Sequence, residues 1–162
     1  MIFDLPTFTL IHVVISVLAI IAGLVVVGGF MAGARLGGWT AFFLATTILT
    51  SVTGFGFPFT KIGPPHVVGA LSLVLLAVSL VARYGKQLEG GWRTTFVTTA
   101  VAALYLNVFV LVVQLFAKTP PLARLAPTQQ ETPFAVTQAL VLLLFLWLGG
   151  AAVRGARTAI RF

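Results

Sequence analysis

The sequence contains no cysteine, so neither a disulfide framework nor a thiolate metal site is available to it. Charged residues are almost as scarce: three acidic and ten basic residues make up 8% of the chain. A typical soluble domain has roughly 25% charged residues. With 59% of its residues hydrophobic, this chain cannot cover a globular surface with polar groups. These proportions exclude a soluble domain, a disordered chain and a nucleic-acid-binding protein, and they predict an integral membrane protein.

Five long uncharged segments lie between the few charged residues. A membrane-spanning helix needs about 20 mainly apolar residues, because the hydrocarbon core is roughly 30 Å thick. No charged residue falls inside these segments, as expected where a charge at mid-bilayer costs several kcal/mol. We therefore predict an all-α, polytopic transmembrane bundle of five helices with short loops, forming one domain over residues 1–162. The predicted spans are residues 8–31, 40–58, 65–82, 95–117 and 134–152.

Basic residues are distributed unevenly between the two membrane faces that five spans would create. Short loops rich in Lys and Arg stay in the cytoplasm. The face of the C-terminus is therefore expected to be cytoplasmic and the N-terminus to lie outside, in the periplasm of a Gram-negative cell. The net charge of +7 is then explained as a topology signal. The N-terminal face would hold Lys61, Lys118 and Arg124 with the acids Asp4 and Glu131, and the other face Arg35, Arg83, Lys86, Arg93, Arg154, Arg157 and Arg161 with Glu89.

Four polar side chains from four of the predicted spans converge on the half of the bundle near the face of the N-terminus, and a fifth lies near mid-membrane. His12 lies about one turn inside the first span, and His66 lies at the start of the third. Because the fourth span runs in the opposite direction, Gln114 comes out at the same level and Asn107 lies near mid-membrane. Gln138 lies one turn into the fifth span. We expect these residues to form the candidate binding site.

Three interpretations of these residues are open. His12 and His66 could ligate the iron of a heme b from opposite sides, with Lys61 or Arg124 meeting the propionates. The His, Asn and Gln side chains could instead donate hydrogen bonds to a quinone that enters from the membrane. In the third interpretation the histidines reach lipid headgroups, and the amides bond between helices. A different metal is not expected, because two histidines rarely suffice for zinc or copper.

The sequence lacks the motifs of common catalytic sites. It has no glycine-rich phosphate loop, no HExxH and no serine that can be matched to a histidine and an intramembrane acid. Asp and Glu are absent from every predicted span, which argues against a cation-coupled transporter. We therefore expect a non-catalytic accessory or structural subunit that packs in the lipid bilayer against other membrane proteins. The alternative is a redox module that binds heme b or quinone near the periplasmic face through His12 and His66.

Three segments carry a resemblance to known sequences. They are TSVTGFGFPF at 50–59, LYLNVFVLVVQ at 104–114 and LAPTQQETPF at 125–134. Together they resemble a family of small, uncharacterised proteobacterial five-helix inner-membrane proteins, and the resemblance covers most of the chain. It implies a multi-pass protein of a bacterial inner membrane and no particular activity. A looser similarity to cytochrome b561-type bundles rests on the histidines near helix ends and implies heme.

Overall fold

A computed structural model describes residues 5–58 and 63–159, and this part of the chain contains helices and no strand. The all-α prediction is therefore confirmed over these residues. Asp4, Lys61 and Arg161 were counted in the prediction of membrane orientation, and they lie outside the described residues.

Each predicted span coincides with a long helix, and the connections are helical in two places. The segment at 118–133, expected as a loop, contains the short helix α5, and α3 continues into the π-helical turn η1. Proline begins α5 and lies at the first or second position of α3 and α6, where its missing N–H costs nothing. The elements are α1 (Leu5–Met31), α2 (Gly37–Gly54), α3 (Pro64–Leu80), η1 (Val81–Gly85), α4 (Trp92–Lys118), α5 (Pro120–Leu125) and α6 (Thr132–Thr158).

Four segments of the described chain are long and apolar enough to cross a membrane. They are Pro6–Met31, Pro64–Gly85, Trp92–Lys118 and Thr132–Thr158, each of 22 residues or more. The fifth long helix, α2, has 18 residues and is not among them, because its Thr and Gly residues lower its mean hydropathy. A membrane protein is thus supported by four helices, whereas the structure does not establish that α2 crosses the bilayer.

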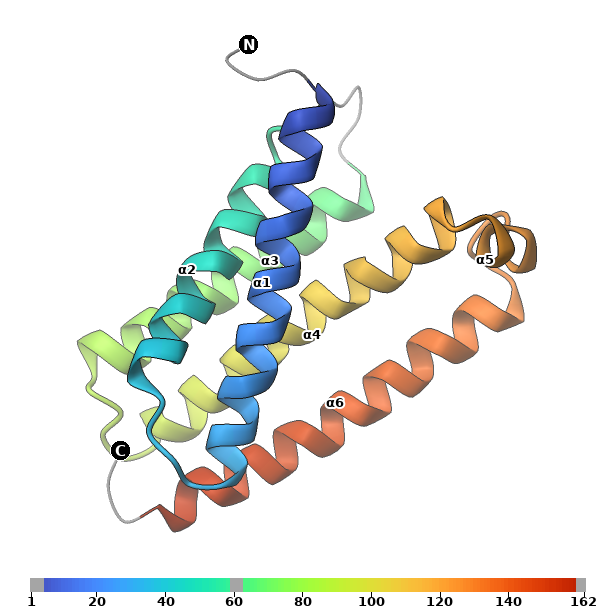
Figure 1. Ribbon diagram of the computed structural model, residues 1–162. Helices are drawn as coiled ribbons and strands as arrows, with labels where there is room; N and C mark the ends of the chain where they lie inside the picture. The colour runs from blue at the N-terminus through green and yellow to red at the C-terminus, as the bar shows by residue number, and fades with distance from the viewer. Residues whose placement is uncertain (1–4, 59–62, 160–162) are drawn as a thin grey trace.

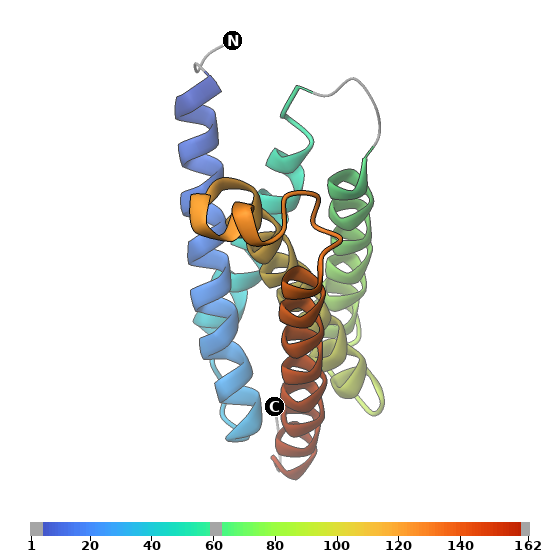
Figure 2. The same cartoon turned by 90° about the vertical axis from the view of Figure 1, so that its right-hand side faces the viewer.

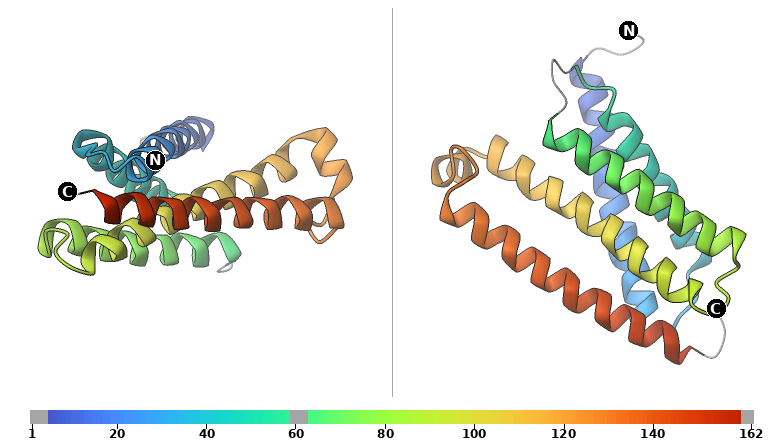
Figure 3. Two further views of the ribbon diagram at one scale, coloured as in Figure 1. Left: turned by 90° about the horizontal axis from the view of Figure 1, so that it is seen from below. Right: turned by 180° about the vertical axis from the view of Figure 1, so that it is seen from behind.

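The helices form two layers. The antiparallel pair α1 and α2 makes one layer, seen on one side of the molecule in the view from below (Figure 3). In the second layer α3, α4 and α6 lie side by side with α4 in the middle (Figure 3). The α1 helix begins at the end of the molecule opposite to that where α6 finishes (Figure 1). The short helix α5 lies between α4 and α6 in the chain, at the end of the molecule where α6 begins (Figure 2).

The outer surface of the bundle differs from that of a soluble protein, although the core is apolar. Among the described residues, the buried polar side chains are all Ser or Thr, five of them on α2. Large apolar side chains instead face outward: Leu143 and Leu146 on α6 are 61% and 64% exposed. Water would penalise such a surface, whereas lipid tails are as apolar as leucine. Hydrocarbon is therefore the solvent that suits this surface.

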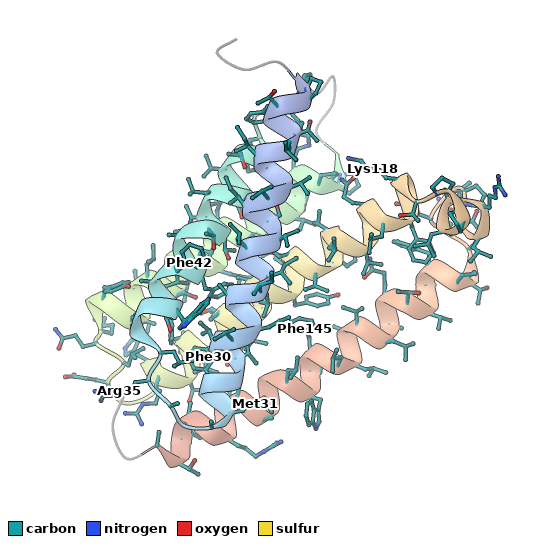
Figure 4. The ribbon with its side chains drawn as sticks, in the orientation of Figure 1. Phe30, Met31, Arg35, Phe42, Lys118 and Phe145 are labelled. Atoms are coloured by element: carbon teal, nitrogen blue, oxygen red, sulfur yellow. The ribbon has the colours of Figure 1, made fainter. Side chains whose placement is uncertain are left out.

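The C-terminal ends of α1 and α6 pack closely together. A Cβ atom on Gly155 would overlap the carbonyl oxygens of Phe30 and Met31, which lie beside α6 (Figure 4). The buried Phe30 ring also meets Phe96 edge-on, with centroids 5.6 Å apart. Only glycine allows the two backbones this approach. Away from this contact α1 and α6 separate (Figure 1).

The α1 helix crosses α4 near the middle of the bundle. A Cβ on Gly23 would lie 2.6 Å from Leu104 Cδ1 and 2.8 Å from the Phe43 ring, and both neighbours are buried. Beyond this crossing the N-terminal half of α1 and the C-terminal half of α4 diverge (Figure 1). The divergence positions the candidate site described next.

Candidate functional site

A cavity of about 610 Å³ lies between the diverging halves of α1 and α4, and the end of α2 and the start of α3 complete its walls. Small-molecule sites in proteins usually have volumes of roughly 300–1,000 Å³. Most of its lining is apolar, with polar side chains from all four helices among the apolar ones. The composition of the cavity is thus typical of a site for an apolar molecule with a few hydrogen-bonding groups.

Four of the five predicted site residues line this one cavity: His12, His66, Asn107 and Gln114. Gln138, the fifth, does not line it. Its Nε2 donates a hydrogen bond of 3.2 Å to the Phe109 carbonyl of α4. Gln138 belongs to α6, which packs on the side of α4 away from α3 (Figure 3). Its depth in the membrane was predicted from sequence, but depth alone does not specify the side of a helix.

The other residues that line the cavity, among them Thr50 and Lys118, were not in the predicted set. Lys118 extends from the end of α4 toward the start of α3 (Figure 4). The signal was present in the sequence, because Lys118 follows Gln114 by four residues and so shares its helical face. Thr50 comes from α2, whose buried face is formed largely of hydroxyl residues.

The His12 ring is oriented by α2. Its Nδ1 lies 2.8 Å from Thr53 Oγ1, and the Thr53 hydroxyl in turn donates to the Leu49 carbonyl at 2.7 Å. A hydroxyl has one proton, so when Thr53 donates to the Leu49 carbonyl, His12 Nδ1 is the donor in the first bond, and a neutral imidazole then has a lone pair on Nε2. The Phe57 ring packs edge-on against the imidazole, with centroids 5.1 Å apart. His12 is thereby held as a hydrogen-bond acceptor.

His66 has the opposite polarity. It lies in the first turn of α3, where its Nδ1 accepts the Gly63 backbone N–H at 3.2 Å. In a neutral imidazole the proton is then on Nε2, so this nitrogen is a donor. The Phe55 ring contacts the imidazole with centroids 5.8 Å apart. One cavity therefore combines a histidine that accepts with a histidine that donates.

Two polar atoms in the cavity wall are buried and have no hydrogen-bond partner within the described chain. They are Asn107 Nδ2 and Thr50 Oγ1. Leaving such a group unsatisfied costs about 1–3 kcal/mol. Most buried polar atoms in folded proteins are paired, so an unpaired one needs a specific explanation. Here the explanation favoured by the geometry is a polar group of a bound molecule.

The donor set does not fit bis-histidine ligation of heme. A histidine that binds a metal through one nitrogen nearly always donates a hydrogen bond from the other. His12 satisfies this rule through Thr53, whereas His66 Nδ1 accepts a hydrogen bond. We therefore derive no chemistry through heme at this site.

The cavity opens sideways, toward the surface that would face lipid. Exposed apolar side chains form both edges of the opening: Val13 and Val17 on α1, and Leu111 and Leu115 on α4. Lys118 is the charged residue of the lining, and no Asp or Glu of the described chain joins it. This arrangement admits a lipid-soluble molecule and presents it with donors and a positive charge. In comparisons with known proteins, no family model, no curated protein and no solved structure matches this chain.

Proposed function

We propose that this protein binds a lipid-soluble quinone in the cavity between α1 and α4. The observation that carries the proposal is the buried Asn107 amide nitrogen, which has no partner in the described chain, in a cavity whose lining also holds His66 and Lys118. A quinone head is a flat apolar ring with carbonyl acceptors on opposite sides, and its tail is soluble in lipid. Asn107 Nδ2, His66 Nε2 and the Lys118 ammonium are suitable donors for these carbonyls.

The membrane placement is part of the proposal. All five long helices cross a bacterial inner membrane, with the N-terminus in the periplasm and the C-terminus in the cytoplasm. The basic side chains Arg35, Arg83 and Arg154 lie at the end where α1 and α6 finish, which the distribution of positive charge assigns to the cytoplasm. Because α2 buries its hydroxyl groups inside the bundle, its modest hydropathy is compatible with crossing the bilayer. The quinone cavity then lies in the periplasmic half.

A titration of the purified protein with a short-chain benzoquinone tests the proposed ligand. We expect saturable binding to the wild type in nanodiscs. His66→Phe and Asn107→Leu should each weaken binding about tenfold, since one hydrogen bond contributes roughly 0.5–1.5 kcal/mol. Gln138→Leu is the matched control, because Gln138 lies on the far side of α4, and its affinity should equal that of the wild type. Absent or non-saturable binding, or equal losses in all three variants, would contradict the proposal.

An accessory role in a larger membrane complex is a second candidate function. The observation that favours it is the long exposed apolar surface of α6, where Leu140 and Trp147 are 61% and 58% exposed. Lipid or another membrane protein can cover this surface. Co-purification with a larger complex at fixed stoichiometry supports the subunit role, and a monodisperse species without partners in mild detergent argues against it. The two roles are compatible, because α6 and the cavity lie on different sides of α4.

A further inference from the structure

We propose that a groove between α4 and α6 binds one anionic phospholipid of the leaflet at the end where α6 finishes. This groove has a volume of about 460 Å³ and is separate from the cavity between α1 and α4. Its lining runs from Thr94 to Tyr105 on α4 and from Val153 back to Leu142 on α6. The proposal is independent of quinone binding, since no residue lines both spaces.

The dimensions of the groove suit one acyl chain. Thr94 and Tyr105 are eleven residues apart, which corresponds to roughly 16 Å along a helix. One leaflet contributes half of a hydrocarbon core of roughly 30 Å. Gly149 and Gly150 have no side chains to fill the groove, and its remaining α6 lining is apolar. A single lipid tail can therefore lie along the groove from the membrane surface to mid-bilayer.

Positive charge is concentrated at the surface end of the same groove. The exposed Arg157 places its Nε 3.5 Å from Thr94 Oγ1, across the groove from α6 to α4. The guanidinium of Arg154 lies beside Gly150, because a Cβ atom added to Gly150 would be 3.5 Å from Arg154 Nη1. Two arginines beside a threonine hydroxyl are suitable donors for a phosphate. Charge complementarity thus selects a lipid with a net negative headgroup over a zwitterionic one.

Binding of lipids of defined charge to the purified full-length protein tests the proposal. We would measure retention of phosphatidylglycerol and phosphatidylcholine by native mass spectrometry after delipidation. The wild type should prefer phosphatidylglycerol by on the order of 20-fold, since each arginine near a membrane surface contributes about fivefold. The double variant Arg154→Gln/Arg157→Gln should lose this preference. Arg35→Gln/Lys86→Gln, which removes two positive charges from connections between helices, is the charge-matched control and should keep it.

A second pair of variants tests the acyl chain. Gly149→Leu and Thr98→Trp each place bulk in the groove and should lose both lipids at least fivefold, with unchanged helix content by circular dichroism as the check on folding. Thr98 is exposed, so its variant tests the groove even where Gly149→Leu fails to fold. Equal binding of the two lipids to the wild type overturns the proposal. Full competition by soluble glycerol phosphate also overturns it, because the site would then recognise phosphate without a tail.

Discussion

The two ends of this bundle differ in how closely their helices approach. Where α1 and α6 finish, the backbones come so near that a single methyl group on Gly155 would overlap carbonyl oxygens of α1. Where α1 begins and α4 ends, the same layers stand apart around a cavity of about 610 Å³. The close end is packed tightly around Gly155, and the open end holds His12, His66, Asn107 and Gln114. Membrane helices gain no hydrophobic reward for packing, so polar groups retained in an open space call for a ligand.

The largest effect on stability is expected from a substitution of Gly155, at the end where α1 and α6 finish. Gly155→Ala puts a Cβ into the Phe30 and Met31 carbonyl oxygens, and backbone atoms cannot rotate away as a side chain can. We expect a loss of at least about 3 kcal/mol in stability, at the upper end of overpacking effects. Denaturation of the protein in mixed micelles measures it.

Gly28→Ala is the matched control for this substitution. Gly28 lies near the same end of α1, and a Cβ atom added to it would have no neighbour within 4 Å. Because alanine has a higher helix propensity than glycine, this variant should be as stable as the wild type or more stable. Equal destabilisation by both substitutions would mean that the close approach of α1 and α6 is not what holds this end together.

The next effect is expected at Asn107, in the open end. Asn107→Leu removes an amide nitrogen that has no partner in the described chain, so stability should be unchanged or higher. The same variant should bind quinone about tenfold more weakly. Paired denaturation and binding curves separate the two effects. A stability loss that accompanies unchanged binding would assign Asn107 to helix packing.

Two serines on α3 provide a comparison of the two ends within one helix. Ser72 accepts a hydrogen bond of 3.1 Å from Ser51, and Ser79 shares one of 2.7 Å with Thr99. Such bonds between membrane helices average about 0.6 kcal/mol, so Ser72→Ala and Ser79→Ala should each lower stability by about that amount. Only Ser72 lines the cavity, so only Ser72→Ala should alter quinone affinity. An effect of Ser79→Ala on affinity would contradict the separation of the ends.

The sequence alone predicts the positions of the helices and four of the residues that line the cavity, for physical reasons. The positions of the helices follow from charge-free segments, because hydrocarbon excludes ionised groups. The common depth of His12, His66 and Gln114 follows from alternating helix directions, which short connections impose. The sequence could not show which side of α4 Gln138 faces, because that depends on how α6 packs. Nor could it give the opposite polarities of the histidines, which are set by Thr53 and the Gly63 N–H.

The smallest effect is expected from pH, at the connection into α6. Desolvation favours the neutral acid at Glu131, but hydrogen bonds from Thr128 and the Gln130 N–H outweigh it and lower the pKa of this carboxyl. Its contribution to stability is therefore present above the ordinary glutamate pKa and is lost as pH falls through the lowered one. Thermal unfolding measured between pH 7 and pH 3 should show that the wild type becomes slightly less stable at the acidic end. Glu131→Gln should lack that loss, and an identical pH profile would show that Glu131 does not contribute.

Photolabelling with an azido-benzoquinone in native membranes, followed by peptide mapping, tests the proposed quinone cavity most directly. The label should be displaced by excess unlabelled quinone and should appear on the residues that edge the cavity, Val13 and Val17 of α1 and Leu111 and Leu115 of α4. Labelling that is not displaced, or that falls mainly on the outward surface of α6, would contradict a quinone site between α1 and α4.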